Sequence, residues 1–350
     1  CHKYRLPALC CTVGGTLLAF CVGRLDSPHD IGTAHMMLRR SEDGGRTWSS
    51  TEAIMAEEGV ICKSPCPIVD RDTGAVHLVF WKHDADTPEE VIWDGKAPCT
   101  VWVMESRDDG QTWSAPRDIT TSVKPAHSTM YVTGPGHGIQ LSSGRLLAPC
   151  CFMTGVFHSR NLDPWYSHVI LSDDHGKTWR VGGIIGPTTT ECCALELADG
   201  SVYVNCRTDQ RRPDLLPKRR QVARSTDGGE SFPPAMVADE LIDPYCAASV
   251  VRLSFESEGG RNRLLFANAA SSDRSRMTIR LSYDEGVSWT AGQIIHYGRS
   301  GYSDLAVAPE RTILCLYEHN EGETGRSPVG SSLALARFSL EWLTQGKDAW

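Results

Sequence analysis

One eight-residue pattern, S-x-D-x-G-x-[ST]-[WF], recurs through this chain and constrains its fold more than any other feature. It occurs five times, at residues 41–48, 106–113, 172–179, 225–232 and 282–289. A single octapeptide of this kind would be weak evidence. Five copies that begin roughly 53 to 66 residues apart indicate a repeat architecture, in which each copy marks one supersecondary unit.

The residues of the pattern are those of a hairpin turn. The Asp carboxylate can accept hydrogen bonds from nearby backbone N–H groups, and the Gly can adopt angles that a side chain forbids. The closing Trp or Phe can bury a large ring between strands. Five equivalent turns cannot all line one pocket, so we interpret the aspartates as structural rather than catalytic: Asp43, Asp108, Asp174, Asp227 and Asp284.

Helix signals are nearly absent, and short strand-like runs separated by Gly and Pro recur instead. These runs are Leu17–Val22, Val76–Trp81, Ser201–Cys206, Arg263–Phe266, Thr312–Tyr317 and Ser332–Phe338. Short strands with a repeat of this length predict an all-β, six-bladed β-propeller of four-stranded antiparallel blades. We expect residues 1–350 to form one domain, in which the run at 332–338 and a strand from the other end of the chain complete the sixth blade.

Composition excludes several classes of protein. The net charge of −8 and the pI of about 5.8 argue against nucleic acid as the main partner. The sequence contains no run of 18 or more apolar residues, so we expect no membrane span. No metal-ligand spacing or cofactor motif is recognisable, so neither a metal nor a cofactor is expected. The sequence predicts no particular oligomeric state.

The chain contains 14 cysteines, including adjacent pairs at 10–11, 150–151 and 192–193. Adjacent residues of a strand point to opposite faces, so these pairs are not natural disulfides. We interpret most of the cysteines as buried apolar residues, which favours a reducing, cytoplasmic compartment. No signal peptide is recognisable, but the abrupt start at Cys1 leaves secretion open if an upstream segment was removed.

Three arginines stand in strand-like settings where an isolated charge is unusual. Arg5 lies in Tyr4–Leu9, Arg207 ends an apolar run, and Arg274 precedes another. Such arginines can converge on one carboxylate, although for each alone a surface salt bridge is the favoured interpretation. The basic stretch at 211–220 is expected to be an exposed loop.

Several motifs together resemble the sialidase (neuraminidase) superfamily over nearly the whole chain. The five turns look like its Asp boxes, and Tyr4–Leu9 looks like its Y/F-R-I-P motif with Leu6 in place of Ile. The segment Gly301–Leu305 looks like its nucleophile segment. Further matches are Thr190–Glu196, Leu316–Glu318 and Gly134–Gly138. The resemblance implies a six-bladed propeller and a retaining exo-glycosidase of the family 33 type that releases terminal sialic acids from glycans.

The resemblance also implies a role for particular residues. The carboxylate-binding arginine triad corresponds to Arg5, Arg207 and Arg274, with Arg276 as the alternative to Arg274. The remaining correspondences are the pocket arginine Arg24, the acid/base Asp30, the nucleophile Tyr302, its partner Glu191, and Glu318, which orients Arg5. A neutral phenol avoids the repulsion that an anionic nucleophile would meet beside the substrate carboxylate, but its pKa of about 10 requires a neighbouring base.

One position departs from the family pattern. Where the family commonly has Met followed by Asp or Asn, this chain has Lys63 and Ser64. We therefore expect a substrate other than plain N-acetylneuraminic acid, such as the deaminated sialic acid Kdn or the octulosonic acid Kdo. A trans-sialidase and a non-catalytic glycan-binding propeller are the alternatives to hydrolysis.

Overall fold

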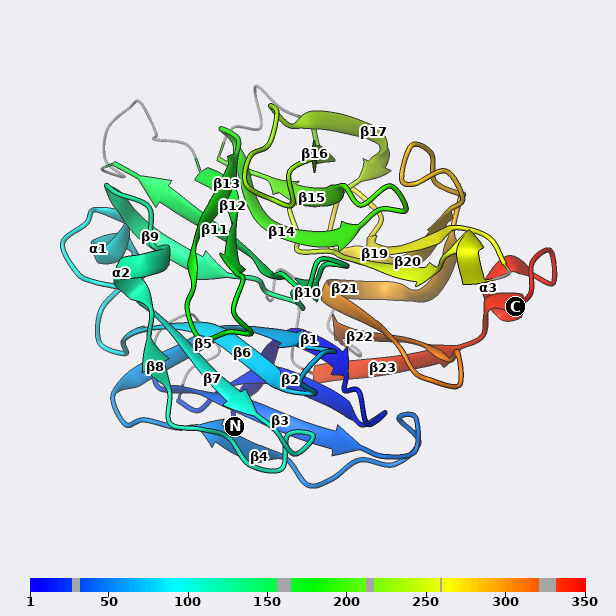
Figure 1. Cartoon of the computed structure of the whole chain (residues 1–350). Helices are drawn as coiled ribbons and strands as arrows, with labels where there is room; N and C mark the ends of the chain where they lie inside the picture. The colour runs from blue at the N-terminus through cyan, green and yellow to red at the C-terminus, as the bar shows by residue number, and fades with distance from the viewer. Residues whose placement is uncertain (27–31, 156–164, 212–216, 259, 321–331) are drawn as a thin grey trace.

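The structure, a computed structural model, describes residues 1–26, 32–155, 165–211, 217–258, 260–320 and 332–350. Antiparallel sheets follow one another around a common centre (Figure 1), as expected for an all-β chain. Helices are short and lie between strands or at the end of the chain. They are α1 (Glu89–Trp93), α2 (Thr120–Val123), α3 (Leu340–Thr344) and the 3-10 turn η1 (Glu256–Glu258).

The strands pair with their neighbours in chain order. The first group is β1 (Lys3–Cys11), β2 (Leu17–Arg24), β3 (Ala34–Ser41) and β4 (Glu52–Met55). The second is β5 (Val60–Val69), β6 (Val76–Asp84), β7 (Thr100–Ser106) and β8 (Arg117–Asp118). One parallel pair, Ala34 with Ile61, joins these two groups.

The third group has β9 (Ser128–Thr133) and β10 (Ile139–Gln140) both paired with β11 (Leu146–Thr154), followed by β12 (Trp165–Ser172) and β13 (Arg180–Ile185). The fourth is β14 (Thr189–Glu196), β15 (Val202–Thr208), β16 (Arg219–Ser225) and β17 (Met236–Ile242). The last strands are β18 (Ser249–Ser254), β19 (Arg263–Ala269), β20 (Ser275–Ser282), β21 (Gln293–Val307), β22 (Ile313–His319) and β23 (Ser332–Phe338).

All six strand-like runs of the sequence correspond to strands, with only Ser201 and Thr312 one residue outside them. Two other expectations need correction. Among the described residues β1 pairs with β2 and not with β23, so the expected pairing of the two chain ends is absent there. The stretch at 211–220, of which 212–216 lies outside the described residues, is not simply an exposed loop. Its Arg220 lies in β16, is fully buried and forms an ion pair with Asp243.

The five repeated turns share one hydrogen-bond pattern. In the first copy, the Ser41 hydroxyl donates to Asp43 Oδ1 at 2.8 Å and accepts from Gly45 N at 2.8 Å. The backbone N–H and hydroxyl of Thr47 donate to the same carboxylate, at 2.8 and 2.6 Å. Equivalent bonds recur in the other four copies. Each aspartate therefore closes its own turn, as the structural interpretation of these residues requires.

The core lies between consecutive sheets. One apolar cluster brings together Val79 of β6, Val103 of β7, Ala148 of β11 and Ile170 of β12, and another continues it to Val204 of β15. Burying such side chains stabilises the fold by roughly 1.5–3 kcal/mol each. Twelve of the 14 cysteines are buried and all are free thiols, consistent with their interpretation as apolar residues.

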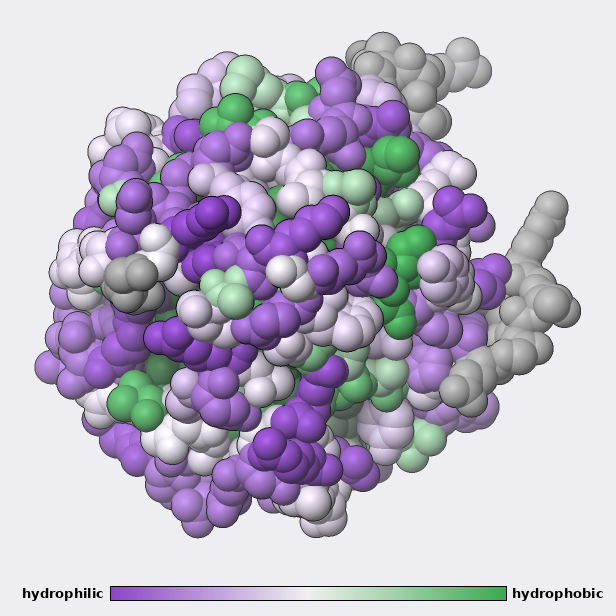
Figure 2. All heavy atoms as spheres, turned by 90° about the vertical axis from the view of Figure 1, so that its right-hand side faces the viewer, coloured by the Kyte–Doolittle hydropathy of each residue, from purple (hydrophilic) through white to green (hydrophobic). Residues whose placement is uncertain are grey.

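The side of the molecule that carries α3 is mostly hydrophilic, with apolar groups in small separate patches (Figure 2). Within the described residues, no helix is both long enough and apolar enough to cross a bilayer.

Candidate active site

A tyrosine, a glutamate and an arginine from distant parts of the chain share hydrogen bonds. The Tyr302 hydroxyl, on β21, donates to Glu191 Oε1 at 2.6 Å and accepts from Arg207 Nη1 at 2.9 Å. Arg207 Nη1 also forms a short ion pair with Glu191 Oε2. Burial and, next, the Glu191 carboxylate raise the pKa of Tyr302, although Arg207 and Arg274 act in the opposite direction. The resting phenol is therefore neutral, with its proton directed at a carboxylate.

A bulge in β14 explains how Glu191 meets Arg207. Cys192 of β14 lies directly opposite Cys206 of β15, and the register shifts between Thr189 and Cys192. Glu191 lies within this bulge, just past the last regular pair, and Arg207 follows Cys206 on the other strand. Bulges redirect side chains and are common beside active sites. The bulge thus turns the carboxylate toward the guanidinium group.

Two more arginines flank the Tyr302 ring. The guanidinium carbon of Arg5, on β1, lies 5.5 Å from the ring centroid, and that of Arg274 lies 5.2 Å from it. Arg274 also donates to the backbone carbonyl of Tyr245 at 3.0 Å. Arg276 is an exposed side chain, so the structure places Arg274 rather than Arg276 beside Tyr302. All three arginines of the expected triad thus surround one phenol.

Glu318, on β22, connects Arg5 to Tyr302 through hydrogen bonds. Its carboxylate accepts from Arg5 Nε at 2.5 Å, from Leu6 N at 3.0 Å and from Tyr302 N at 3.2 Å. The side chain has no exposed surface. Because an ionised carboxylate only accepts hydrogen bonds, three converging donors fix its position and, with it, both neighbouring strands.

A cavity of about 180 Å³ opens beside Tyr302. The other predicted pocket residues that the structure describes line it. Arg24, at the end of β2, lines it. Lys63 Nζ forms an ion pair with Glu89 Oε1 at 2.6 Å, and Ser64 Oγ accepts from Trp81 Nε1 at 3.1 Å. Lys63 and Ser64 therefore do line the cavity. Asp30 lies outside the described residues.

A second cavity of about 130 Å³ adjoins the first on the side of Arg207. Trp93, Val132, Trp165 and Glu191 line both cavities. The sequence analysis did not identify either tryptophan or Glu89 as a site residue. The sequence gives no specific signal for them, because Trp93 and Trp165 lie outside the Asp boxes together with Trp81, Trp102, Trp342 and Trp350.

A possible cation site lies elsewhere, among Asp70, Asp72 and His175. Gln140 Nε2 donates to Asp70 Oδ1 at 3.0 Å and to Asp72 Oδ2 at 2.8 Å, and His175 Nδ1 lies 2.9 Å from Asp70 Oδ2. The amide of Gln140 thus already satisfies both carboxylates, and none of these residues lines the cavities beside Tyr302.

Comparison with known proteins gives the family. Residues 15–315 match the model of the BNR repeat-like domain. A sialidase of Micromonospora viridifaciens is 34% identical over 97% of this chain, which spans only 52% of that protein. An exo-alpha-sialidase of Aspergillus fumigatus is 27% identical, with 99% of this chain and 86% of that protein covered. Among solved structures, the Hadza microbial sialidase Hz136 superposes with a TM-score of 0.84 at 26% identity, over 97% of this chain and 66% of that one. The chain therefore belongs to the sialidase superfamily.

Proposed function

We propose that the chain is a retaining exo-glycosidase that releases terminal sialic acid, or a related 2-keto-3-deoxy sugar acid, from glycoconjugates. The observation that carries this proposal is the contact of the Tyr302 hydroxyl with Glu191, inside a ring of three arginines. A pure glycan-binding protein has no use for a phenol directed at a carboxylate. The relatives named sialidase support the same activity.

Substrate binding in this proposal depends on the triad. The carboxylate on the anomeric carbon of a sialic acid would lie among Arg5, Arg207 and Arg274, because guanidinium groups match carboxylates in charge and shape. Hydrogen bonds to charged groups contribute roughly 1.5–3 kcal/mol each, so three arginines can anchor a small ligand. Glu318 would keep Arg5 in the required orientation.

The chemistry has two steps in this proposal. Glu191 accepts the proton of Tyr302 while the phenol oxygen attacks the anomeric carbon, and Asp30 protonates the departing glycosidic oxygen. Asp30 then removes a proton from water, whose oxygen attacks the anomeric carbon and breaks its bond to Tyr302 with net retention. The departing phenolate takes its proton back from Glu191, which restores the resting site. Sialidases, which use a tyrosine nucleophile, are one of the exceptions to the two-carboxylate scheme of glycosidases. A buried neutral phenol suits this role, since its anion forms only when Glu191 takes the proton.

We further propose that a six-bladed propeller of one domain, residues 1–350, carries this site. The six successive antiparallel groups, the last formed by the end of β21 with β22 and β23, support six blades.

The decisive test is turnover of a fluorogenic sialoside by the wild type and by Tyr302→Phe. We expect kcat to fall by about a hundredfold or more, because the phenyl ring cannot form the covalent bond. Tyr131→Phe is the matched control: Tyr131 is buried in β9 with its ring against His168, while its neighbours Met130 and Val132 line the cavity. Equal turnover by the wild type and Tyr302→Phe would overturn the mechanism. Proton NMR of the first sugar product tests retention.

We propose that Lys63 and Ser64 shift the sugar preference away from N-acetylneuraminic acid. The ammonium group of Lys63 is held by Glu89 and lies 5.6 Å from the Trp81 ring centroid, so this wall of the cavity presents an ion pair instead of a single acid. Release rates from matched glycosides of N-acetylneuraminic acid, Kdn and Kdo test the idea. Identical rates for all three would refute it, without affecting the role of Tyr302.

A further inference from the structure

A larger cavity, of about 310 Å³, lies at the opposite end of the same inner strands from Tyr302. Along each of these strands, a residue of the candidate active site is followed a few positions later by residues that line this cavity. On β1 the two are Arg5 and Leu9, on β14 they are Glu191 and Leu195, and on β21 they are Tyr302 and Leu305. The cavity is therefore separate from the candidate active site.

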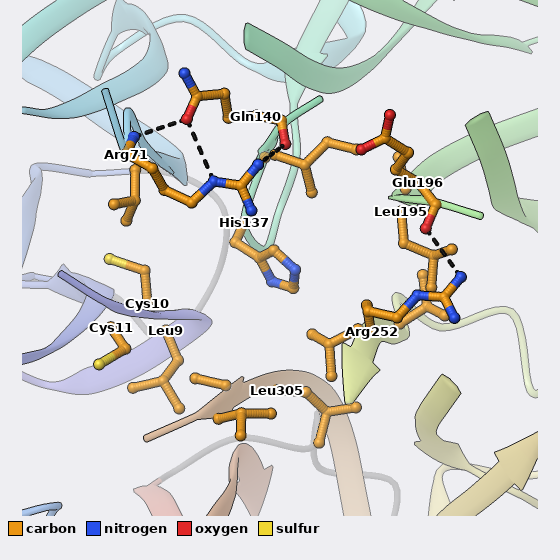
Figure 3. Close-up of a pocket in the computed structure, with 18 of the residues that line it drawn as sticks. Leu9, Cys10, Cys11, Arg71, His137, Gln140, Leu195, Glu196, Arg252 and Leu305 are labelled. Carbon is orange, nitrogen blue, oxygen red and sulfur yellow. Dashed lines mark hydrogen bonds between the residues drawn. The ribbon is translucent and has the colours of Figure 1, made fainter. Parts of the chain in front are cut away.

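The wall of this cavity combines apolar and cationic groups. Leu9, Leu195 and Leu305 form part of its apolar surface, and Arg71, His137 and Arg252 also line it, with Arg252 beside Leu195 (Figure 3). Glu196 is the one carboxylate among the described lining residues. Its oxygens accept from the backbone N–H and the hydroxyl of Ser142, at 2.8 and 2.6 Å, so both oxygens already have hydrogen-bond donors.

His137 is fixed with one ring nitrogen available to the cavity. Its Nδ1 lies 2.8 Å from Asp304 Oδ1, which also accepts from the Ser249 hydroxyl at 2.8 Å. The second carboxylate oxygen accepts from Leu9 N at 2.8 Å. Because the carboxylate can only accept, Nδ1 carries a proton, and Nε2 is left for a ligand. Burial lowers the pKa of His137, but Asp304 more than offsets this and leaves it above its ordinary value, which favours the imidazolium.

The two arginines supply further positive charge at the rim. Arg71 Nη2 donates to the backbone carbonyl of Gln140 at 2.8 Å, and Nε donates to Gln140 Oε1 at 3.4 Å, so two of its five side-chain N–H donors contact neutral acceptors. Arg252 forms a two-point ion pair with Glu285, at 2.8 and 2.5 Å, and donates to the Glu196 carbonyl. Arg71 and His137 are thus the main cationic contacts that the cavity offers, beside an apolar surface.

We propose that this cavity is a second ligand site, which binds a compact organic carboxylate. The carboxylate of the ligand contacts His137 Nε2 and Arg71, and its apolar body contacts the leucines. The volume lies near the lower end of the roughly 300–1,000 Å³ of small-molecule pockets, which restricts the ligand to a small one. Charge-assisted hydrogen bonds explain why a carboxylate is favoured over its uncharged counterpart. This site goes beyond the proposed glycosidase activity and does not depend on it.

Benzoate is the probe, with benzamide as its uncharged counterpart of similar shape. In a titration of the intact chain followed by NMR of carbon-13-labelled histidine rings, we expect the His137 signal to shift and saturate with benzoate but not with benzamide. Arg71→Gln should raise the Kd of benzoate about tenfold, as expected for loss of one charge-assisted contact. Arg274→Gln, which alters the candidate active site, should leave this Kd unchanged.

The His137→Gln variant assigns the histidine signal, because that signal disappears from its spectrum. In this variant saturable binding should also be lost, as measured by the resonances of benzoate itself. Since loss of the Asp304 contact can destabilise the fold, Arg71→Gln carries the test if His137→Gln does not fold. The proposal is overturned if no saturation occurs up to about 20 mM benzoate. An unchanged Kd in Arg71→Gln, or a Kd altered only by Arg274→Gln, overturns it equally.

Discussion

Glu318→Gln tests how the candidate active site is held together. Gln has the size of Glu but carries an NH₂ group in place of one carboxylate oxygen. The Glu318 carboxylate accepts from Arg5 Nε and Leu6 N on one oxygen and from Tyr302 N on the other. In either orientation of the amide, its NH₂ group must face one of these donors. At least one hydrogen bond is therefore lost, and Arg5 loses its ion pair with the buried Glu318 carboxylate.

The expected loss follows from these contacts. A hydrogen bond to a charged group contributes roughly 1.5–3 kcal/mol, so kcat/KM should fall by about 10- to 150-fold if Arg5 binds the substrate carboxylate. The free energy of unfolding should fall too, by roughly 1.5–3 kcal/mol, because Gln cannot replace the charge-assisted hydrogen bond to Arg5. Turnover of a fluorogenic sialoside and urea unfolding measure the two quantities.

Glu105→Gln is the control for Glu318→Gln. Glu105 is partly exposed and forms an ion pair with Arg107, and such pairs contribute at most about 1 kcal/mol. Its oxygen also lies 3.8 Å from His77 Nδ1, but burial lowers the pKa of that histidine, which favours its neutral form. We expect both quantities to stay near wild type in this variant. If Glu318→Gln unfolds at the wild-type urea concentration and keeps kcat/KM within about twofold, then the buried carboxylate does not hold Arg5, and the reasoning is wrong.

Three more predictions follow from buried or turn-forming aspartates. Asp304→Asn should lower the unfolding temperature by several degrees, because four donors converge on that carboxylate. Calorimetry measures this, and an unchanged unfolding temperature would show that these four hydrogen bonds do not stabilise the fold. Asp174→Ala removes the acceptor for Thr178, so the unfolding temperature should fall while turnover at 25 °C stays unchanged. For Asp227, hydrogen bonds from Ser225 and Ser231 lower the pKa to about 2. Since this folded-state pKa lies below the ordinary value of about 3.9, its stabilisation is complete above pH 4 or so and is lost as the pH falls toward 2. The urea midpoint of Asp227→Asn should therefore fall less than that of wild type over this range, and parallel curves would refute the assignment.

The sequence predicted local features better than long-range ones. The Asp boxes were predictable because each aspartate bonds within four residues of itself, so the pattern contains its own partners. The expected completion of the sixth blade by β23 and a strand from the other end of the chain is not seen among the described residues, where β23 pairs only with β22. A short turn after Cys11 lets β1 pair locally with β2, and closing a short loop costs less entropy than joining the chain ends.

The candidate site was predictable only in part. Isolated arginines in strand-like runs suggested Arg5, Arg207 and Arg274, but only the family resemblance connected them with Tyr302 and Glu191. Trp93 and Glu89 could not be found in this way. They lie on the short helix α1, outside any repeated motif, and reach the cavity only through the packing of α1 beside β9.

β21 has a mechanical consequence for the molecule. Its first half pairs with β20 and its second half with β22, and Tyr302 follows immediately after the change of partner. One continuous strand thus belongs to two sheets, and neither sheet can separate from its neighbours without disturbing the other. Amide hydrogens of β20 and β22 should consequently exchange with solvent in a single cooperative event, and the phenol is anchored in a segment that opens only when both sheets do.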